Sequence, residues 1–291
     1  MALLLWVWLG CTVFVLGCAW RAYRYASAPE HLRWDLYPVA HEPNAYGGSY
    51  LEEKDWWTKP RHSSLVREAV FMAEEILLLR GVWTHNRRLW WGSFPFHWGL
   101  YLMVAVTFGL AAAALGLGGQ PLLLALAVVG GLGGALLAVG SVVLLYLRAR
   151  DPKLRPYTAP VDLMNLVLLA VLGTLSALVA NGGMEPVAAA VADLAQARPV
   201  SASTLLATQM TVASLFLLYL PATRMVHFFS KYFTYHAVRW DDRPREAGSA
   251  LDRRLRAALD FGVDWSAEHV RTGKTWAEVA TTLPEEKSAG E

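Results

Sequence analysis

The chain has 291 residues, 55% of them hydrophobic and only 17% of them charged, and its mean hydropathy is +0.31. Soluble domains carry about 25% charged residues, so this composition excludes an ordinary soluble globular protein. The formal net charge of +2 provides no excess of basic residues for a phosphate backbone, and we therefore expect no nucleic-acid partner.

Five long segments of the sequence are almost free of charged residues. They cover residues 1–20, 94–117, 121–147, 161–180 and 203–229. Each has about 20 residues or more, which is enough for a helix to cross a hydrocarbon layer of about 30 Å. The segments are too long and too continuously apolar for the alternating strands of a membrane barrel. The sequence therefore predicts an all-α membrane protein, a bundle of five transmembrane helices.

The first segment raises the question of whether it is removed after synthesis. A secretory signal begins with basic residues, whereas no basic residue precedes Arg21. Residues 15–18 (VLGC) resemble a lipoprotein cleavage box, but the basic residues that follow favour a retained membrane anchor. Cys11 and Cys18 are two helical turns apart, too far for a disulfide within one helix, so we expect both to be small packing residues.

Basic residues between the spans predict the orientation of the chain. They are concentrated in residues 21–93, in the 148–160 link and after residue 231, whereas 118–120 is uncharged and 181–202 has only Arg198. Cytoplasmic loops carry an excess of Lys and Arg. We therefore expect the N-terminus outside, the C-terminus inside and a long cytoplasmic insertion between spans one and two, in the inner (cytoplasmic) membrane. The chain would then divide into a membrane domain, residues 1–230, and a cytoplasmic tail, residues 231–291.

The insertion between the first two spans is rich in aromatic and basic residues. Its tryptophan and tyrosine side chains are typical of anchors at a membrane interface. Ser63 or Ser64 can cap a helix that runs to Arg80, with Gly81 as its stop. This helix would lie in the headgroup layer or form part of a docking surface for a partner.

Two further helices are predicted in the tail. They are amphipathic and lie around Leu251–Phe261 and near Trp276–Thr282, and we expect the polar residues that follow to be disordered. Within the third span, a cluster of glycines would let neighbouring helices approach closely. Its members are Gly130, Gly131, Gly133 and Gly134.

Two histidines lie within the apolar segments. Of the eight histidines, only His97 and His227 do so, one just after the start of the second span and the other just before the end of the fifth. Both ends are predicted to face the cytoplasm, so the imidazoles would lie at similar depth and could bind one haem iron from opposite sides. Arg224 would lie on the same helix face as His227 and could pair with a haem propionate. Depth alone leaves open that both histidines only form hydrogen bonds at the interface.

Two segments of the chain resemble the nitrate reductase gamma subunit family. Residues 216–227 (FLLYLPATRMVH) are similar to that family's last span, with its apolar run, Pro, Arg and His. Residues 94–99 (FPFHWG) are similar to its second span, in which a Gly follows the His by two residues. The resemblance covers roughly residues 94–230 and implies a membrane cytochrome b with His97 and His227 as axial haem ligands.

The resemblance also implies how many haems the chain carries. The family's typical pattern has two haems and four histidines, the other two lying ten residues after His97 and eighteen residues before His227. Those positions hold Thr107 and Gln209, neither of which is a usual haem ligand. The missing histidines belong to the outer haem of the pattern, so we expect one haem b rather than two.

Members of the family exchange electrons between a quinone pool and a cytoplasmic iron–sulfur subunit. The long insertion is more similar to members found beside heterodisulfide-reductase-like iron–sulfur proteins, so the resemblance implies such a partner, with menaquinone or another quinone as the substrate. Without an outer haem, we expect the quinone to bind in the inner half, near His85, Trp90, Trp91 and Trp98. The chain itself would have no catalytic residue.

Two other functions are compatible with parts of the sequence. The loss of one histidine pair is compatible with a haem-free membrane anchor that recruits a soluble redox complex, although the retained pair argues against it. A transporter fits less well, because five spans do not divide into equal repeats and Asp162 lies at a helix start. We therefore expect the electron-transfer subunit of a quinone-linked respiratory oxidoreductase complex.

Overall fold

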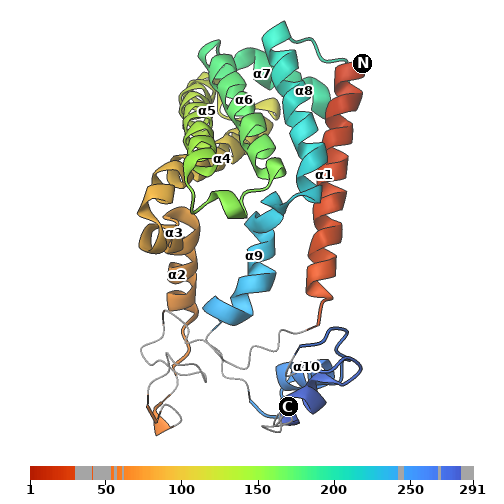
Figure 1. Cartoon of the computed structure of the whole chain (residues 1–291). Coiled ribbons are helices and arrows are strands. Elements are labelled where there is room, and N and C mark those ends of the chain that lie inside the picture. The colour runs from red at the N-terminus through yellow and green to blue at the C-terminus, as the bar shows by residue number, and fades with distance from the viewer. Residues whose placement is uncertain are drawn as a thin grey trace. The chain divides into compact units, whose positions relative to one another are not determined.

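The computed structural model of the chain consists mainly of helices (Figure 1). It describes residues 1–29, 41, 54–55, 58–60, 62–241, 246–267 and 270–282. The chain divides into two compact units. The first comprises Met1–Arg21 and Met72–His227, and the second falls within Ala22–Phe71 and Phe228–Glu291. The part of the predicted aromatic insertion between residues 30 and 61 lies largely outside the described residues.

Five helices of the described chain are long and apolar enough to cross a membrane. They are α1 (Ala2–Ala26), α4 (Arg87–Ala114), α5 (Gly119–Arg150), α6 (Pro160–Asn181) and α8 (Thr204–Tyr219), the last counted together with the turn that continues it to Ala222. Large apolar side chains such as Phe108 and Val128 are exposed on them, as on a surface that faces lipid. The predicted all-α architecture with five apolar spans is confirmed, and the chain is a multi-pass membrane protein.

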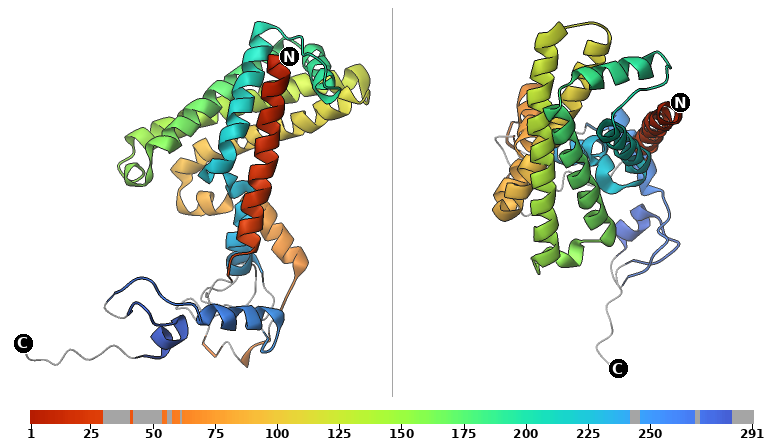
Figure 2. Two further views of the ribbon diagram at one scale, coloured as in Figure 1. Left: turned by 90° about the vertical axis from the view of Figure 1, so that its right-hand side faces the viewer. Right: turned by 90° about the horizontal axis from the view of Figure 1, so that it is seen from above.

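Helices α4, α5 and α6 pack side by side through glycines (Figure 2). A Cβ atom added at Gly99 of α4 would lie 2.4 Å from the backbone nitrogen of Leu137 in α5. One added at Gly134 of α5 would lie 2.6 Å from the carbonyl oxygen of Gly173 in α6. Only glycine lets backbones come this close. The predicted close approach is confirmed at Gly134 but not at Gly131, where nothing lies within 4 Å.

We expect Gly140→Ala to destabilise the bundle, because its Cβ atom would lie 2.4 Å from the backbone nitrogen of Phe96. Overpacking of this kind costs about 1–3 kcal/mol. Gly131→Ala, on the same helix, is the matched control, since its methyl group would meet open space. Thermal unfolding of both variants in one detergent measures the difference. Equal melting temperatures would show that the helices accommodate a methyl group at Gly140 without a loss of stability.

Helix α1 lies along α8 (Figure 1). Gly10 contacts the backbone of Ser214, so that an added Cβ atom would lie 2.9 Å from the carbonyl oxygen of Ser214. The indole N–H of Trp6 donates a hydrogen bond to the carbonyl oxygen of Thr211 at 3.1 Å. These contacts join α1 to α8 at single points, and among its residues only Leu4 and Gly10 are buried.

A short helix that the sequence did not predict lies between α6 and α8. Helix α7 (Glu185–Ala195) packs on α4 and contributes to an apolar cluster with Val106 and Leu110. The amide of Gln120, in the first turn of α5, donates a hydrogen bond to the carboxylate of Glu185 at 2.8 Å. Residues 118–120 and the start of α7 therefore lie at the same end of the bundle.

Helix α2 (Leu65–Leu77) begins as predicted, with the backbone N–H of Arg67 donating to the hydroxyl of Ser64. The predicted stop at Gly81 is wrong, because the chain turns at Leu79 (φ 52°) and Gly81 lies inside α3 (Arg80–His85). Side chains of α4 account for this early stop. Trp90, Trp98 and Tyr101 donate to the carbonyl oxygens of Leu78, Leu77 and Ile76 at 2.8, 3.0 and 2.8 Å. These bonds satisfy the last carbonyls of α2 without a glycine.

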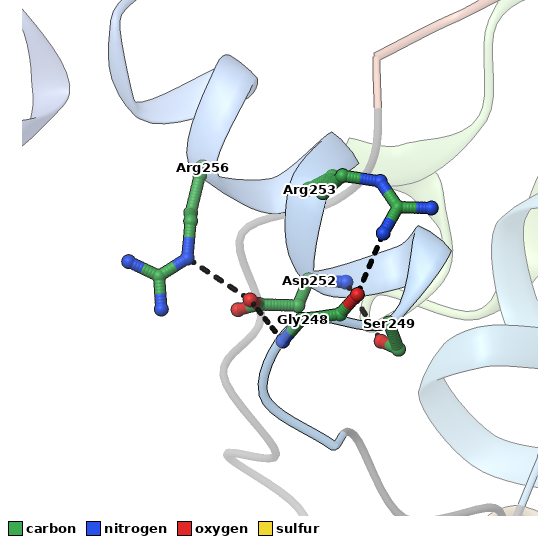
Figure 3. A network of polar contacts seen from close by, with 5 residues as sticks. All are labelled: Gly248, Ser249, Asp252, Arg253 and Arg256. Atoms are coloured by element: carbon green, nitrogen blue, oxygen red, sulfur yellow. Dashed lines mark hydrogen bonds and ion pairs between the residues drawn. The ribbon is translucent and has the colours of Figure 1, made fainter.

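The second unit contains the two helices predicted in the tail, α10 (Ala250–Leu259) and α11 (Trp276–Thr281). Figure 3 shows how α10 begins: the carboxylate of Asp252 accepts from the backbone N–H of Gly248 at 2.8 Å and from Arg256 at 3.0 Å. These hydrogen bonds hold the pKa of Asp252 below its usual range. Both tail helices are thus confirmed, each with a polar cap at its start.

Candidate functional site

His97 lies in the third turn of α4, and its ring orientation is set by its own helix. Its Nδ1 atom lies 2.7 Å from the carbonyl oxygen of Ser93. A carbonyl oxygen only accepts, so Nδ1 carries the proton and Nε2 carries the lone pair. Metal-binding histidines commonly donate their second ring N–H to a carbonyl in this way, which fixes the tautomer and increases the basicity of the other nitrogen. His97 is half-buried.

His227 follows an interruption in the fifth apolar helix. After α8 the chain forms a 3₁₀ turn η3 (Leu220–Ala222), an extended residue Thr223, a second 3₁₀ turn η4 (Arg224–Val226), and then α9 (His227–Tyr235). The prediction of one continuous helix over 203–229 is therefore wrong beyond Tyr219. The cause is Pro221, which has no N–H and cannot continue the helical hydrogen bonding.

Side chains from two parts of the chain stabilise this interruption. The guanidinium of Arg21, in α1, donates from Nη1 to the carbonyl oxygens of Pro221 and Thr223 at 2.8 and 2.9 Å. The hydroxyl of Thr223 donates to the carbonyl of Leu220 and accepts from the backbone N–H of Met225. The sequence indicates no such role for Arg21, and its only signal there is that it is the first charged residue after 20 uncharged ones.

The two histidines predicted to act together are neighbours. Their ring centres are 6.0 Å apart and their planes are inclined by 69°. Two imidazoles that share one metal ion from opposite sides have ring centres about 6 Å apart, because each metal–nitrogen bond is about 2 Å and each ring nitrogen lies about 1 Å from its ring centre. The spacing of His97 and His227 thus fits a pair of axial ligands. His227 is exposed, so its ring is accessible to a bound group.

Arg224 lies in the 3₁₀ turn that precedes His227, not in a continuous α-helix as predicted. In a 3₁₀ turn the side chains three residues apart are nearly in line, so Arg224 and His227 still share a face, for a different geometric reason. The Arg224 side chain is exposed and forms no ion pair within the described part of the chain. An exposed cation without an ion-pair partner in the described part of the chain is suited to a carboxylate of a bound molecule.

The two positions that carry histidines in the typical family pattern have structural roles. The hydroxyl of Thr107 donates to the carbonyl of Met103 within α4 at 2.9 Å. The amide of Gln209 donates to the hydroxyl of Ser176 at 2.9 Å and ties α8 to α6. The Thr107 bond lies within its own helix and the Gln209 bond joins two helices, and neither side chain carries an imidazole nitrogen.

The aromatic residues predicted to line a quinone site are only partly together. Trp90 and Trp91 are in contact, with ring centres 5.2 Å apart, and Trp90 stacks on Phe94 at 4.5 Å. The N–H groups of Trp90 and Trp98 are used to cap α2, so these two indoles offer a bound ring their faces and not their donors. His85, at the end of α3, and Trp91 are both exposed.

The comparison with known proteins bears on the whole of this site. No curated protein matches the chain significantly. A sequence model of the family described as nitrate reductase gamma subunit matches residues 82–241, which is more than half of the chain. The match includes His97, His227 and the interruption between α8 and α9. Members of this family are haem-containing cytochrome b subunits of respiratory oxidoreductases. The chain therefore belongs to the nitrate reductase gamma subunit family.

Proposed function

We propose that the chain carries one haem b between His97 and His227 and transfers electrons between a quinone and a cytoplasmic iron–sulfur protein. The observation that carries this proposal is the 6.0 Å spacing of the two imidazole rings, together with the contact between Nδ1 of His97 and the Ser93 carbonyl, which orients the His97 ring. When bound, haem supplies one-electron transfer without any group on the protein changing its bonds.

The residues around the two histidines would orient the haem and adjust its potential. The Ser93 carbonyl holds the His97 ring and increases its basicity, and Arg224 supplies a positive charge for a propionate. The Phe96 and Tyr101 rings lie 5.2 and 6.3 Å from the His97 ring and cover it with apolar surface. Ligand basicity and exclusion of water are two of the means by which a protein sets a haem potential.

A single haem per chain is the expected stoichiometry, because Thr107 and Gln209 have no ligand atom suited to iron. Pyridine haemochrome analysis of the purified chain should give about one haem b per polypeptide, and a dithionite-reduced minus oxidised spectrum should show its absorption band. A value near two would mean that residues assigned here to packing bind a second haem. A value of zero would favour the haem-free membrane anchor.

The iron–sulfur centres belong on another polypeptide in this proposal. A cluster of the common type needs four cysteine ligands, whereas this chain has two cysteines, both in α1. We propose a cytoplasmic subunit similar to the heterodisulfide-reductase-like proteins as the partner. The quinone, menaquinone or a related one, would bind in the inner half near His85, Trp90, Trp91 and Trp98, where the faces of the indoles can stack on a planar ring.

The proposed orientation has the N-terminus outside and the C-terminus in the cytoplasm, in the inner membrane. The ion pair between Arg88 and Asp151, at 3.4 Å, joins the start of α4 to the residue after α5. This basic end is opposite the end at which Gln120 meets Glu185. The sequence places most Lys and Arg at the first of these ends, which favours its lying in the cytoplasm.

A further inference from the structure

The contact between Arg21 and the interrupted fifth helix joins residues 200 and 202 positions apart in the sequence. A single nitrogen, Nη1, donates to both carbonyls. Thr223 is extended (φ −103°, ψ 174°) and is the N-cap residue of η4, so its carbonyl begins that turn, whereas the carbonyl of Pro221 lies before the break. Arg21 therefore ties together the carbonyls on the two sides of the interruption.

The close approach of α1 at this point is built into its sequence. Gly17 lies one helical turn before Arg21, and a Cβ atom added there would lie 2.7 Å from the Cβ atom of Pro221. The glycine lets α1 touch the proline, and the arginine one turn later reaches the carbonyls beyond it. Carbonyl groups at a helix end carry partial negative charge, and leaving them unpaired in an apolar bundle is costly.

His227 follows this turn directly. Thr223 is the residue at which the chain changes direction, and only the three residues of η4 separate it from His227. The direction in which the chain leaves Thr223 therefore determines where the His227 ring lies with respect to His97. Because no continuous helix fixes the direction of this segment, the hydrogen bonds at the interruption fix it.

We infer that Arg21 is a positioning residue for the second iron ligand: by holding the carbonyls of Pro221 and Thr223, it keeps His227 opposite His97. This inference rests on the proposed function. It gives Arg21 a role beyond that of a basic residue at a membrane edge, a role that Arg24, exposed one turn later in the same helix, does not share. Arg24 is thus a matched control of identical chemistry.

The test compares the full-length Arg21→Gln, Arg21→Lys and Arg24→Gln variants with the wild-type protein. A haem with two histidine ligands has no open position and does not bind carbon monoxide when reduced, whereas a haem that has lost one ligand does. Removing a group that orients a metal ligand typically lowers metal affinity about 10- to 100-fold. For Arg21→Gln we expect a tenfold or greater loss of haem affinity and a carbon monoxide spectrum in the haem that remains.

Arg21→Lys should recover most of the wild-type behaviour, because one ammonium nitrogen can donate to both carbonyls as Nη1 does. Arg24→Gln should match the wild type in haem affinity and in its inertness to carbon monoxide. Should Arg21→Gln fail to accumulate, Thr223→Val loosens the same turn from the other side, and it should also make the reduced haem bind carbon monoxide.

The outcomes separate this inference from the proposed function. The positioning role alone is overturned if the wild-type haem does not bind carbon monoxide and the Arg21→Gln and Thr223→Val variants have the same haem affinity and the same lack of carbon monoxide binding. An equal defect in Arg24→Gln overturns it as well, since general basic charge would then be the cause. A wild-type protein without haem overturns the proposed function and the inference together.

Discussion

Replacing either His97 or His227 by Ala is expected to abolish the absorption band of the b-type haem. The two rings are 6.0 Å apart and supply the only pair of imidazoles in contact within the described chain, so the loss of one leaves the iron with a single protein ligand. The reduced minus oxidised spectrum of purified variants measures the effect, and His62→Ala, an exposed histidine of the second unit, is the control that should keep the band.

The two substitutions need not fail in the same way. Neither variant should keep the normal band. Because His97 is fixed on a glycine-packed helix and oriented by Ser93, any haem still held in His227→Ala should be weakly bound and should bind carbon monoxide, whereas His97→Ala removes the better-oriented ligand. A normal band in both variants would show that the haem, if present, is bound elsewhere. A normal band in one variant would show that the ligand pair is assigned wrongly on that side.

The second large effect concerns the side of the membrane on which each end of the bundle lies. In a background with Cys11→Ser and Cys18→Ser, a cysteine introduced as Gln196→Cys should react with an impermeant thiol reagent added to the outside of intact cells. Lys153→Cys should react only after the membrane is opened. Both positions are exposed in the structure, so accessibility within the protein does not limit either reaction.

The expected result is all or none, because each position lies beyond the end of an apolar helix rather than within it. The predicted orientation of the chain in the membrane rests on the charge distribution alone. Basic residues flank Lys153, whereas Arg198 is the one basic residue near Gln196. Labelling of Gln196→Cys only in opened cells, with Lys153→Cys labelled from outside, would invert the orientation and move the proposed haem to the outer face.

The spans and the histidine pair were predictable because each depends on local composition. An uncharged run of about 20 residues is readable as a span without knowing its neighbours. The proximity of His97 and His227 followed from placing two helix ends on one side of the membrane. It needed no knowledge of which helices touch, and the structure brings the two rings into contact.

The features that escaped prediction depend on contacts between distant residues. A continuous span was predicted over residues 203–229, because whether a helix passes through a proline or ends there depends on what binds the carbonyls around it. Here a residue of another helix, Arg21 in α1, binds the carbonyls of Pro221 and Thr223. The end of α2 was placed at Gly81 by the usual preference for glycine, yet the donors from α4 allow Leu79 to turn instead. Helix α7 is too short and too rich in alanine to produce a membrane signal.

The glycine two residues after His97 gives helix α5 an influence on a site to which it contributes no ligand. Gly99 of α4 lies against the backbone of Leu137 in α5. On the α5 side of the same contact is Gly133, where an added Cβ atom would lie 2.9 Å from the Cβ atom of Leu102. The position of His97 along the axis of α4 is therefore fixed by the contact between α4 and α5. A substitution in α5 that changes its contact with Gly99 would therefore move His97 along the bundle without touching it.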